Sequence, residues 1–410
     1  MTTEQRWRRL TAAARFATPL RSLSGASGRW ARPLYGRSAS GQGRLALRYL
    51  LLTPLVAGCI AEPYRLTGMR GGPTFYPQDS IELRFPANAS LGTRLRFARD
   101  AAGRHVVVDT GQWRLFYFDS RGTLLSNFSI RSTDGSSGDF ASGPAILPGD
   151  SLVAVHDWGT KEIRVYGLGD GAERSRTPAP VRTVGQNWSW RGDTAFVGAG
   201  LSEALVAEWR TAMRTVVPRG ETPAASLANS GKYFAHGPPE VVARDSSLIV
   251  AVPMEPGLWV LNREGQVTSR LTVPALLRRG TPPGYREAET APRRSRWLQM
   301  TGSAVRGLFL RPSGELLLWY ADRDLMTRDS IREPRQGNFR SYISIVSATL
   351  EQVCLDAPLP ASADTPHVLA VSGDTVEVLA RRDTALGNTR LILGRYTVST
   401  GGCDWVPTGQ

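Results

Sequence analysis

The sequence offers few residues that could catalyse a reaction. Its four histidines lack the spacing of a metal-binding helix, and the chain has no HExxH, CxxC, GxSxG, P-loop or Asp-x-Asp-x-Asp-Gly motif. The histidines are His105, His156, His236 and His367. We therefore predict no catalytic, metal-binding or cofactor-binding residue, and the sequence favours a binding role over an enzymatic one.

Asp109 and Asp157 are the carboxylates that most resemble catalytic ones, because each ends an apolar run. Each also begins a turn with glycine two residues later, in Asp-Thr-Gly and Asp-Trp-Gly. An Asp side chain at such a position accepts hydrogen bonds from the backbone N–H groups of the following turn. We predict this structural role for both residues.

A second group of candidates lies in the segment 274–303, which is rich in arginine and carries two aromatic residues. Guanidinium groups beside aromatic rings suit anionic or sugar-like ligands, through bidentate hydrogen bonds and stacking. Glu287 and Glu289 lie in the same segment, and a charged loop is also often a merely solvated one. The candidate ligand contacts are Arg278, Arg279, Tyr285, Arg293, Arg294, Arg296 and Trp297.

The elements that must position these residues follow a repeat. The stretch 105–125, HVVVDTGQWRLFYFDSRGTLL, contains two apolar runs rich in β-branched and aromatic residues, each ended by a turn. Six units share this pattern of a tight Asp, Gly or Ser turn, an apolar run and a second run. The first runs begin at His105, Leu152, Thr194, Leu248, Leu316 and Thr375.

Units of this size, each with four short strands, are typical of β-propeller blades. The stretch VVVDTGQWRLFYFDSRG resembles a blade of the six-bladed NHL-like β-propellers, in particular those of bacterial exported proteins. The resemblance implies an all-β fold, a six-bladed β-propeller of four-stranded antiparallel blades over 89–407. It brings no catalytic motif with it, and a fold alone does not define a function.

The longest connections of such a fold should gather on one face. In a blade of strands a to d, the a–b and c–d turns leave one face, and the b–c and d–a connections leave the other. The long segments all fall in the second class. They are the d–a segments 131–143, 218–238 and 274–303 and the b–c segment 323–340. Insertions gathered on one face often mark the binding face.

The chain begins with a segment that we expect to lie outside the fold. Residues 1–43 have no strand or helix periodicity and suggest a disordered leader or a start site placed too far upstream. Residues 44–59 resemble a lipoprotein signal peptide, whose apolar stretch is too short to span a bilayer. Residues 60–88 read as a tether, in which 80–85 could instead be a strand that closes the last blade.

The net charge of +14 comes mostly from that leader. Residues 1–58 contain ten Arg, no Lys and one acidic residue, Glu4. The folded part is therefore only modestly basic, which argues against nucleic acid as a partner.

The three cysteines have roles that export would explain. Cys59 ends the stretch Leu55-Val-Ala-Gly-Cys59, which resembles the lipobox in which bacterial lipoproteins are acylated; an ordinary signal peptide and a structural cysteine are the alternatives. Cys354 and Cys403 remain as an even pair, and an oxidising compartment favours a disulfide between them. The outer strands of neighbouring blades can, however, diverge too far for a disulfide.

The leading functional hypothesis is a lipid-anchored protein of the bacterial cell envelope, on its periplasmic or surface side. It would bind an unknown protein or small ligand through its long-loop face, without a cofactor. The alternative is a propeller hydrolase or lactonase with a divalent cation such as calcium in its central channel, but no metal ligands could be matched to this sequence.

Overall fold

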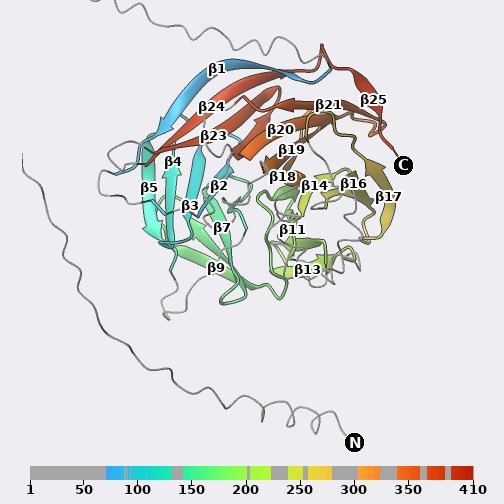
Figure 1. The fold of residues 1–410 in the computed structure, drawn as a ribbon. Coiled ribbons are helices and arrows are strands. Elements are labelled where there is room, and N and C mark those ends of the chain that lie inside the picture. The colour runs from blue at the N-terminus through green and yellow to red at the C-terminus, as the bar shows by residue number, and fades with distance from the viewer. Residues whose placement is uncertain are drawn as a thin grey trace, which may run out of the picture. The chain divides into compact units, whose positions relative to one another are not determined.

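The computed structural model describes residues 71–86, 89, 91–92, 94–131, 142–200, 204–222, 239–252, 257–278, 303–323, 339–360, 367–383 and 389–409. In these ranges every regular element is a β-strand (Figure 1). None of these residues belongs to a helix that could span a lipid bilayer. The strands form six antiparallel sheets, and the prediction of a six-bladed, all-β propeller is confirmed.

The first three blades contain four short strands each. Blade 1 comprises β2 (Leu95–Arg99), β3 (His105–Asp109), β4 (Arg114–Phe118) and β5 (Leu124–Ser129). Blade 2 comprises β6 (Ala145–Ile146), β7 (Leu152–Asp157), β8 (Glu162–Gly167) and β9 (Glu173–Pro178). Blade 3 comprises β10 (Ser189–Arg191), β11 (Thr194–Gly198), β12 (Val206–Arg210) and β13 (Thr215–Arg219).

The last two blades are completed by strands from the chain ends. Blade 4 comprises β14 (Glu240–Arg244), β15 (Ser247–Ala251), β16 (Gly257–Leu261) and β17 (Val267–Thr272). Blade 5 comprises β18 (Ser303–Leu310), β19 (Leu316–Arg323), β20 (Phe339–Val346), β21 (Gln352–Pro358) and, outermost, β25 (Trp405–Pro407). Blade 6 comprises β22 (His367–Ser372), β23 (Thr375–Asp383), β24 (Thr389–Ser399) and, outermost, β1 (Thr74–Leu83).

The core lies between neighbouring blades. The second strand of each blade is buried on both sides, which explains why the sequence there is continuously apolar. In β3, Val106 and Val108 pack toward blade 2, whereas Val107 packs toward blade 6. Equivalent clusters fill the other inter-blade spaces. Trp188, Trp190 and Trp209 belong to the cluster between blades 2 and 3, as core packing predicts.

The ring closes between blade 6 and blade 1. The inner strands β22 and β2 contact each other. Glu377 accepts hydrogen bonds from His105 Nε2 at 3.1 Å and from Arg395 Nε at 3.0 Å, and it forms an ion pair with Arg99, whose Nε lies 2.8 Å from Oε2. Burial opposes ionisation of Glu377, but the His105 hydrogen bond and the Arg99 charge hold the pKa of its carboxyl below the usual value. One buried carboxylate thus links the last blade to the first.

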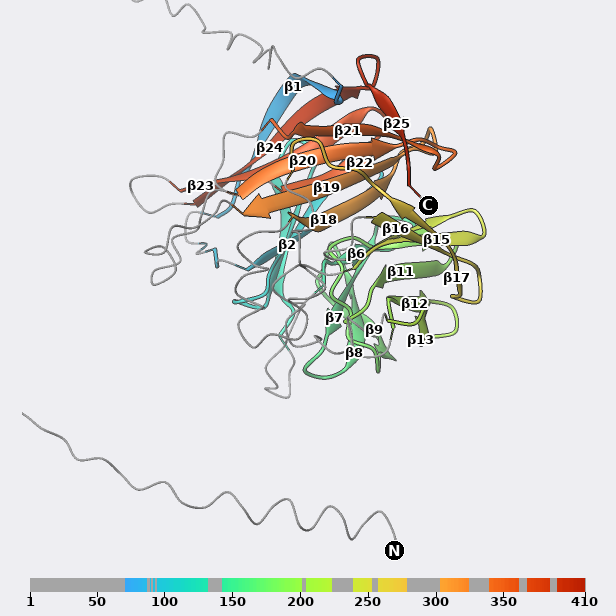
Figure 2. The same ribbon diagram turned by 45° about the vertical axis from the view of Figure 1, so that its right-hand side comes forward.

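Both chain ends strap the closing blades. β1 pairs along β24 in blade 6, beside which it lies in Figure 1, and Arg84 then donates its N–H to Gly122 O of blade 1. The closing strand therefore begins earlier than the expected 80–85, at Thr74. β25 pairs with β21, and Gly409 then exchanges hydrogen bonds with Thr272 of blade 4, where the C-terminus lies in Figure 2.

A disulfide fastens the C-terminal strap to blade 5. Cys354 of β21 is bonded to Cys403, with their Cα atoms 5.3 Å apart. The distance is short because β25 brings the chain beside β21, so the bond lies within blade 5 and does not have to span two diverging outer strands. Gly71, just before β1, forms a bridge with Cys403 as well. The start of β1, the disulfide and β25 therefore meet at one place.

We expect the double substitution C354S/C403S to lower the free energy of unfolding by about 2–4 kcal/mol, because the bond closes a loop across a separation of 49 residues. Urea denaturation followed by tryptophan fluorescence measures this. A reductant should shift wild-type protein to the same midpoint and leave the variant unchanged. An unaltered midpoint in the variant would show that strand pairing alone closes the ring.

Candidate functional site

The connections between strands divide sharply between the two faces of the propeller. Each a–b and c–d turn has at most five residues. Every longer connection is of the b–c or d–a class, and the longest joins Thr272 to Ser303. We call the end of the blades with the b–c and d–a connections the loop face and the opposite end the turn face. The four predicted long segments connect strand ends at the loop face, although most of their residues lie outside the described ranges.

Buried side chains hold the roots of these connections by accepting backbone N–H groups. Asp109, at the end of β3, is fully buried. Its Oδ1 accepts Gly111 N at 2.9 Å and Gln112 N at 3.1 Å, and its Oδ2 accepts Gly92 N at 2.6 Å. Asp157 accepts Gly159 N at 3.0 Å in the same way. Both carboxylates have the turn-forming role predicted for them.

Asp356, near the end of β21, fixes the start of the longest connection. Its carboxylate accepts the N–H groups of Leu276, Leu277 and Arg278 at 2.6–2.8 Å. The Arg278 side chain is also buried, with Nη2 2.7 Å from Val273 O and the guanidinium 3.9 Å from the centre of the Tyr320 ring. Arg278 therefore anchors the loop from inside, and its side chain is buried, whereas a ligand contact was predicted from its arginine-rich surroundings.

The other predicted ligand contacts lie outside the described residues. They are Arg279, Tyr285, Arg293, Arg294, Arg296 and Trp297, and the acylation candidate Cys59 also lies there. Contact between these side chains and a ligand stays a prediction. The described residues contain no group of three or more His, Cys, Asp or Glu that could hold a metal ion.

His156 holds the connection between blades 2 and 3 at the loop face. Its Nδ1 accepts Thr183 N at 3.1 Å and lies 2.6 Å from Thr183 Oγ1, which is also hydrogen-bonded to Ser142 Oγ at 2.9 Å. Because Nδ1 accepts a backbone N–H, the neutral ring carries its proton on Nε2. Burial, reinforced by the charge of Arg182, lowers the pKa of His156 to about 4. The imidazole is therefore neutral at physiological pH and serves as an acceptor.

Glu240 holds the same connection from blade 4. It is the first residue of β14 and fully buried. Its Oε1 accepts Gln186 N at 2.9 Å, Asn187 also hydrogen-bonds the carboxyl, and Oε2 has no hydrogen-bond partner among the described residues. Burial raises the pKa of Glu240 to about 8 despite these hydrogen bonds. A neutral carboxyl thus lies beside the inner strands, shielded from solvent.

Sequence reasoning did not select Glu240, Asp356 or His156 as loop anchors. Glu240 follows a proline-containing segment and Asp356 lies inside an apolar strand pattern, so neither has a local turn signature. The sequence contains one signal for such anchors, a polar residue at a position that the strand pattern assigns to the core. A polar side chain buried there requires a hydrogen-bond partner.

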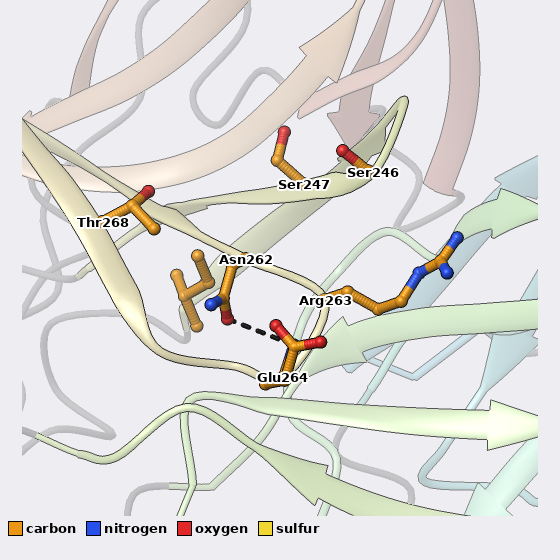
Figure 3. A pocket seen from close by; sticks show the side chains of 7 residues that line it. Ser246, Ser247, Asn262, Arg263, Glu264 and Thr268 are labelled. Atoms are coloured by element: carbon orange, nitrogen blue, oxygen red, sulfur yellow. Dashed lines mark hydrogen bonds between the residues drawn. The ribbon is translucent and has the colours of Figure 1, made fainter.

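A shallow groove lies at the turn face of blade 4 (Figure 3). Asn262, Glu264, Ser246 and Ser247 line it, and Asn262 Oδ1 accepts Glu264 N at 3.1 Å and Gln266 N at 2.8 Å. The Arg263 side chain extends away from the other labelled residues in Figure 3. The polar groups serve the turn itself, so this groove does not have the convergent side chains of a ligand site.

No protein-family model and no curated protein matches the sequence. Solved structures share the fold. A member of the DUF4221 family from Bacteroides vulgatus has a TM-score of 0.56 and 8% identity, over 81% of this chain and 99% of its own. A putative exported protein from Bacteroides fragilis has a TM-score of 0.52 and 9% identity, over 80% of this chain and 97% of its own. At these identities the propeller architecture is what is shared.

Replacement of Glu240 by Gln should make stability less sensitive to alkaline pH. Because the folded-state pKa is raised, folding favours the protonated carboxyl, and its contribution is present below about pH 4.5 and lost as the pH rises to about 8. Over that window the stability of wild type relative to E240Q should fall by roughly 1 kcal/mol per pH unit. Urea denaturation at pH 5, 7 and 9 measures the difference, with the exposed Glu264→Gln as control. Parallel pH profiles for wild type and E240Q would contradict the assignment.

Proposed function

We propose that this protein is a binding scaffold that holds a partner on the loop face of its propeller. The observation that carries the proposal is the division of the connections: every one longer than five residues starts and ends at that face. Recognition loops on a rigid scaffold are a common way to build a binding surface. The short turns opposite leave little room for a second variable surface.

The anchored roots support this role. A loop that binds a partner loses less entropy when its ends are already fixed in the free protein. Asp109, Asp356, Glu240 and His156 each accept backbone N–H groups of a loop-face connection or turn, and all four side chains are buried. The scaffold therefore presents its connections from fixed positions.

The lipobox-like sequence before Cys59 supports an exported, acylated protein held at the bacterial cell envelope. The sequence of the first blade supports a propeller of the NHL-like type. One of the similar structures named above is described as a putative exported protein, which agrees with this location. An acyl anchor would leave the propeller outside the membrane, joined to it by the segment that follows Cys59.

A variant in which a Gly/Ser linker replaces 279–300 should lose partners that wild type captures from detergent-solubilised envelope. A matched control replaces Arg263 and Glu264, at a turn-face connection, by Gly and Ser. Quantitative mass spectrometry should show at least one partner depleted about tenfold with the first variant and retained by the control. Identical partner sets for all three proteins would remove the loop face as the binding surface.

Substitution of Cys59 by Ala should release the protein from the membrane fraction, because the acylated thiol is lost. Metabolic labelling with a fatty acid, followed by membrane fractionation, measures both effects. Labelled protein in the Cys59→Ala variant, or unchanged membrane recovery, would argue against this anchor. The Cys354→Ser/Cys403→Ser variant, which keeps Cys59, is the control.

A further inference from the structure

We propose that the loop face of blades 1 and 2 carries a binding surface for an acidic polysaccharide. This inference rests on the function proposed above and names the ligand chemistry of one part of the loop face. The surface consists of two tryptophans and four cations, which we call the Trp–cation surface. Its members are Trp113, Arg131, Trp158, Lys161, Arg182 and Arg94, whose backbone oxygen accepts Thr110 N of the first turn at 3.0 Å.

The two b–c turns of blades 1 and 2 have the same construction. The first is Asp109-Thr-Gly-Gln-Trp113 and the second is Asp157-Trp158-Gly-Thr-Lys161. In each, the aspartate is fully buried and accepts backbone N–H groups of the turn. Trp113 and Lys161 both have positive φ, 52° and 57°. Each turn thus directs its acid inward and leaves a half-buried tryptophan and its neighbours at the surface.

Cations lie over both rings. The Arg131 guanidinium is 4.8 Å from the centre of the Trp113 ring. Lys161 Nζ is 5.7 Å, and the Arg182 guanidinium 5.9 Å, from the centre of the Trp158 ring. Arg131 and Lys161 are exposed. A cation held over an aromatic ring has less conformational freedom to lose when it binds an anion.

The two turns belong to one continuous, hydrogen-bonded strip. Trp113 O accepts Ile130 N at 2.8 Å, which places Arg131 beside the first turn, and Ile130 O accepts Arg164 Nη1 at 3.3 Å. The same Arg164 nitrogen is 3.9 Å from Asp157 Oδ2, at the start of the second turn. Beyond it, Lys161 O accepts Ala179 N at 2.8 Å, at the beginning of the connection that carries Arg182.

The exposed charge of this strip is mostly positive. The described segments 110–113, 158–161 and 179–184 contain no acidic residue. Glu162, which follows Lys161, is half-buried and lies 3.6 Å from Arg176. The complementary ligand carries anionic groups. The surface is also too polar for the apolar centre of a typical protein interface, because its only large apolar groups are two separate rings flanked by cations.

The repetition of the unit points to a repeating ligand. Each of two successive blades carries one tryptophan with cations over it. An extended chain with an anionic group on each sugar unit would contact both tryptophans and their cations. A polyuronate meets this description, with carboxylates for the cations and sugar C–H groups for the parts of the tryptophan ring faces that the cations leave uncovered. Nucleic-acid bases stack over a whole ring face, and the cations over Trp113 and Trp158 leave less of that face open.

The test uses the full chain and compares two double charge reversals. R131E/K161E alters the Trp–cation surface, and R214E/R263E makes the same charge change at exposed turn-face positions. Calorimetry with polygalacturonate oligomers at several salt concentrations should show about tenfold weaker binding for R131E/K161E and less than about twofold change for R214E/R263E. The arginine-rich leader contributes equally to all variants.

Neutral amylose oligomers should not bind measurably to any of these proteins. Equal weakening by both double variants would overturn the proposal, since general charge would then account for binding. Single-stranded DNA or polyglutamate that binds more tightly than polygalacturonate and is lost in R131E/K161E would also overturn it, in favour of that ligand class. R131Q/K161Q provides a milder variant if the charge reversal lowers the melting temperature. If polygalacturonate does not bind but wild type still captures partners that the 279–300 linker variant loses, this proposal is wrong and the proposed scaffold function is retained.

Discussion

The closure of the ring is the constraint on which the other features depend. The first and last blades of a propeller are far apart in the sequence, and they must be joined for the ring to close. A strand from one chain end that pairs in the blade at the other end provides this link. Here β1 supplies the outer strand of blade 6, and β25 is added outside blade 5, with the disulfide between Cys354 and Cys403 at their meeting point. Glu377 joins blades 6 and 1 from within. Only a closed ring keeps the six loop-face ends at fixed mutual positions.

Buried acceptors transmit that rigidity to the loop face. Glu240 and His156 hold one connection from two different blades, and Asp356 reaches from blade 5 to the start of the connection that follows blade 4. Each interaction therefore ties neighbouring blades together as well as positioning a loop. Their burial has an electrostatic consequence, because Glu240 is held neutral by a raised pKa and His156 by a lowered one. A neutral acceptor avoids the cost of an unpaired buried charge.

The arginine content of the fold has a structural explanation on the turn face. Arg104 donates to Asp150 O of the next blade, Arg191 to Ser247 O, and Arg311 pairs with Asp374. Each links an a–b turn to that of the following blade. Planar guanidinium groups with several donors suit this bridging of carbonyl and carboxylate groups better than lysine does. On the loop face, Arg94 and Arg131 are instead exposed to solvent.

The sequence by itself determined the local elements. The second strands begin at the predicted residue in five blades and one residue earlier in blade 4, because alternating turns and β-branched runs act over a few neighbouring positions. The roles of Asp109 and Asp157 also follow from adjacent residues. Tertiary structure alone decided that Glu240 meets Gln186, 54 residues away, and that Asp356 meets Leu276, 80 residues away. It also decided that Arg278 is buried. Such pairs form only when the ring brings distant segments together, and no local pattern encodes which segments those are.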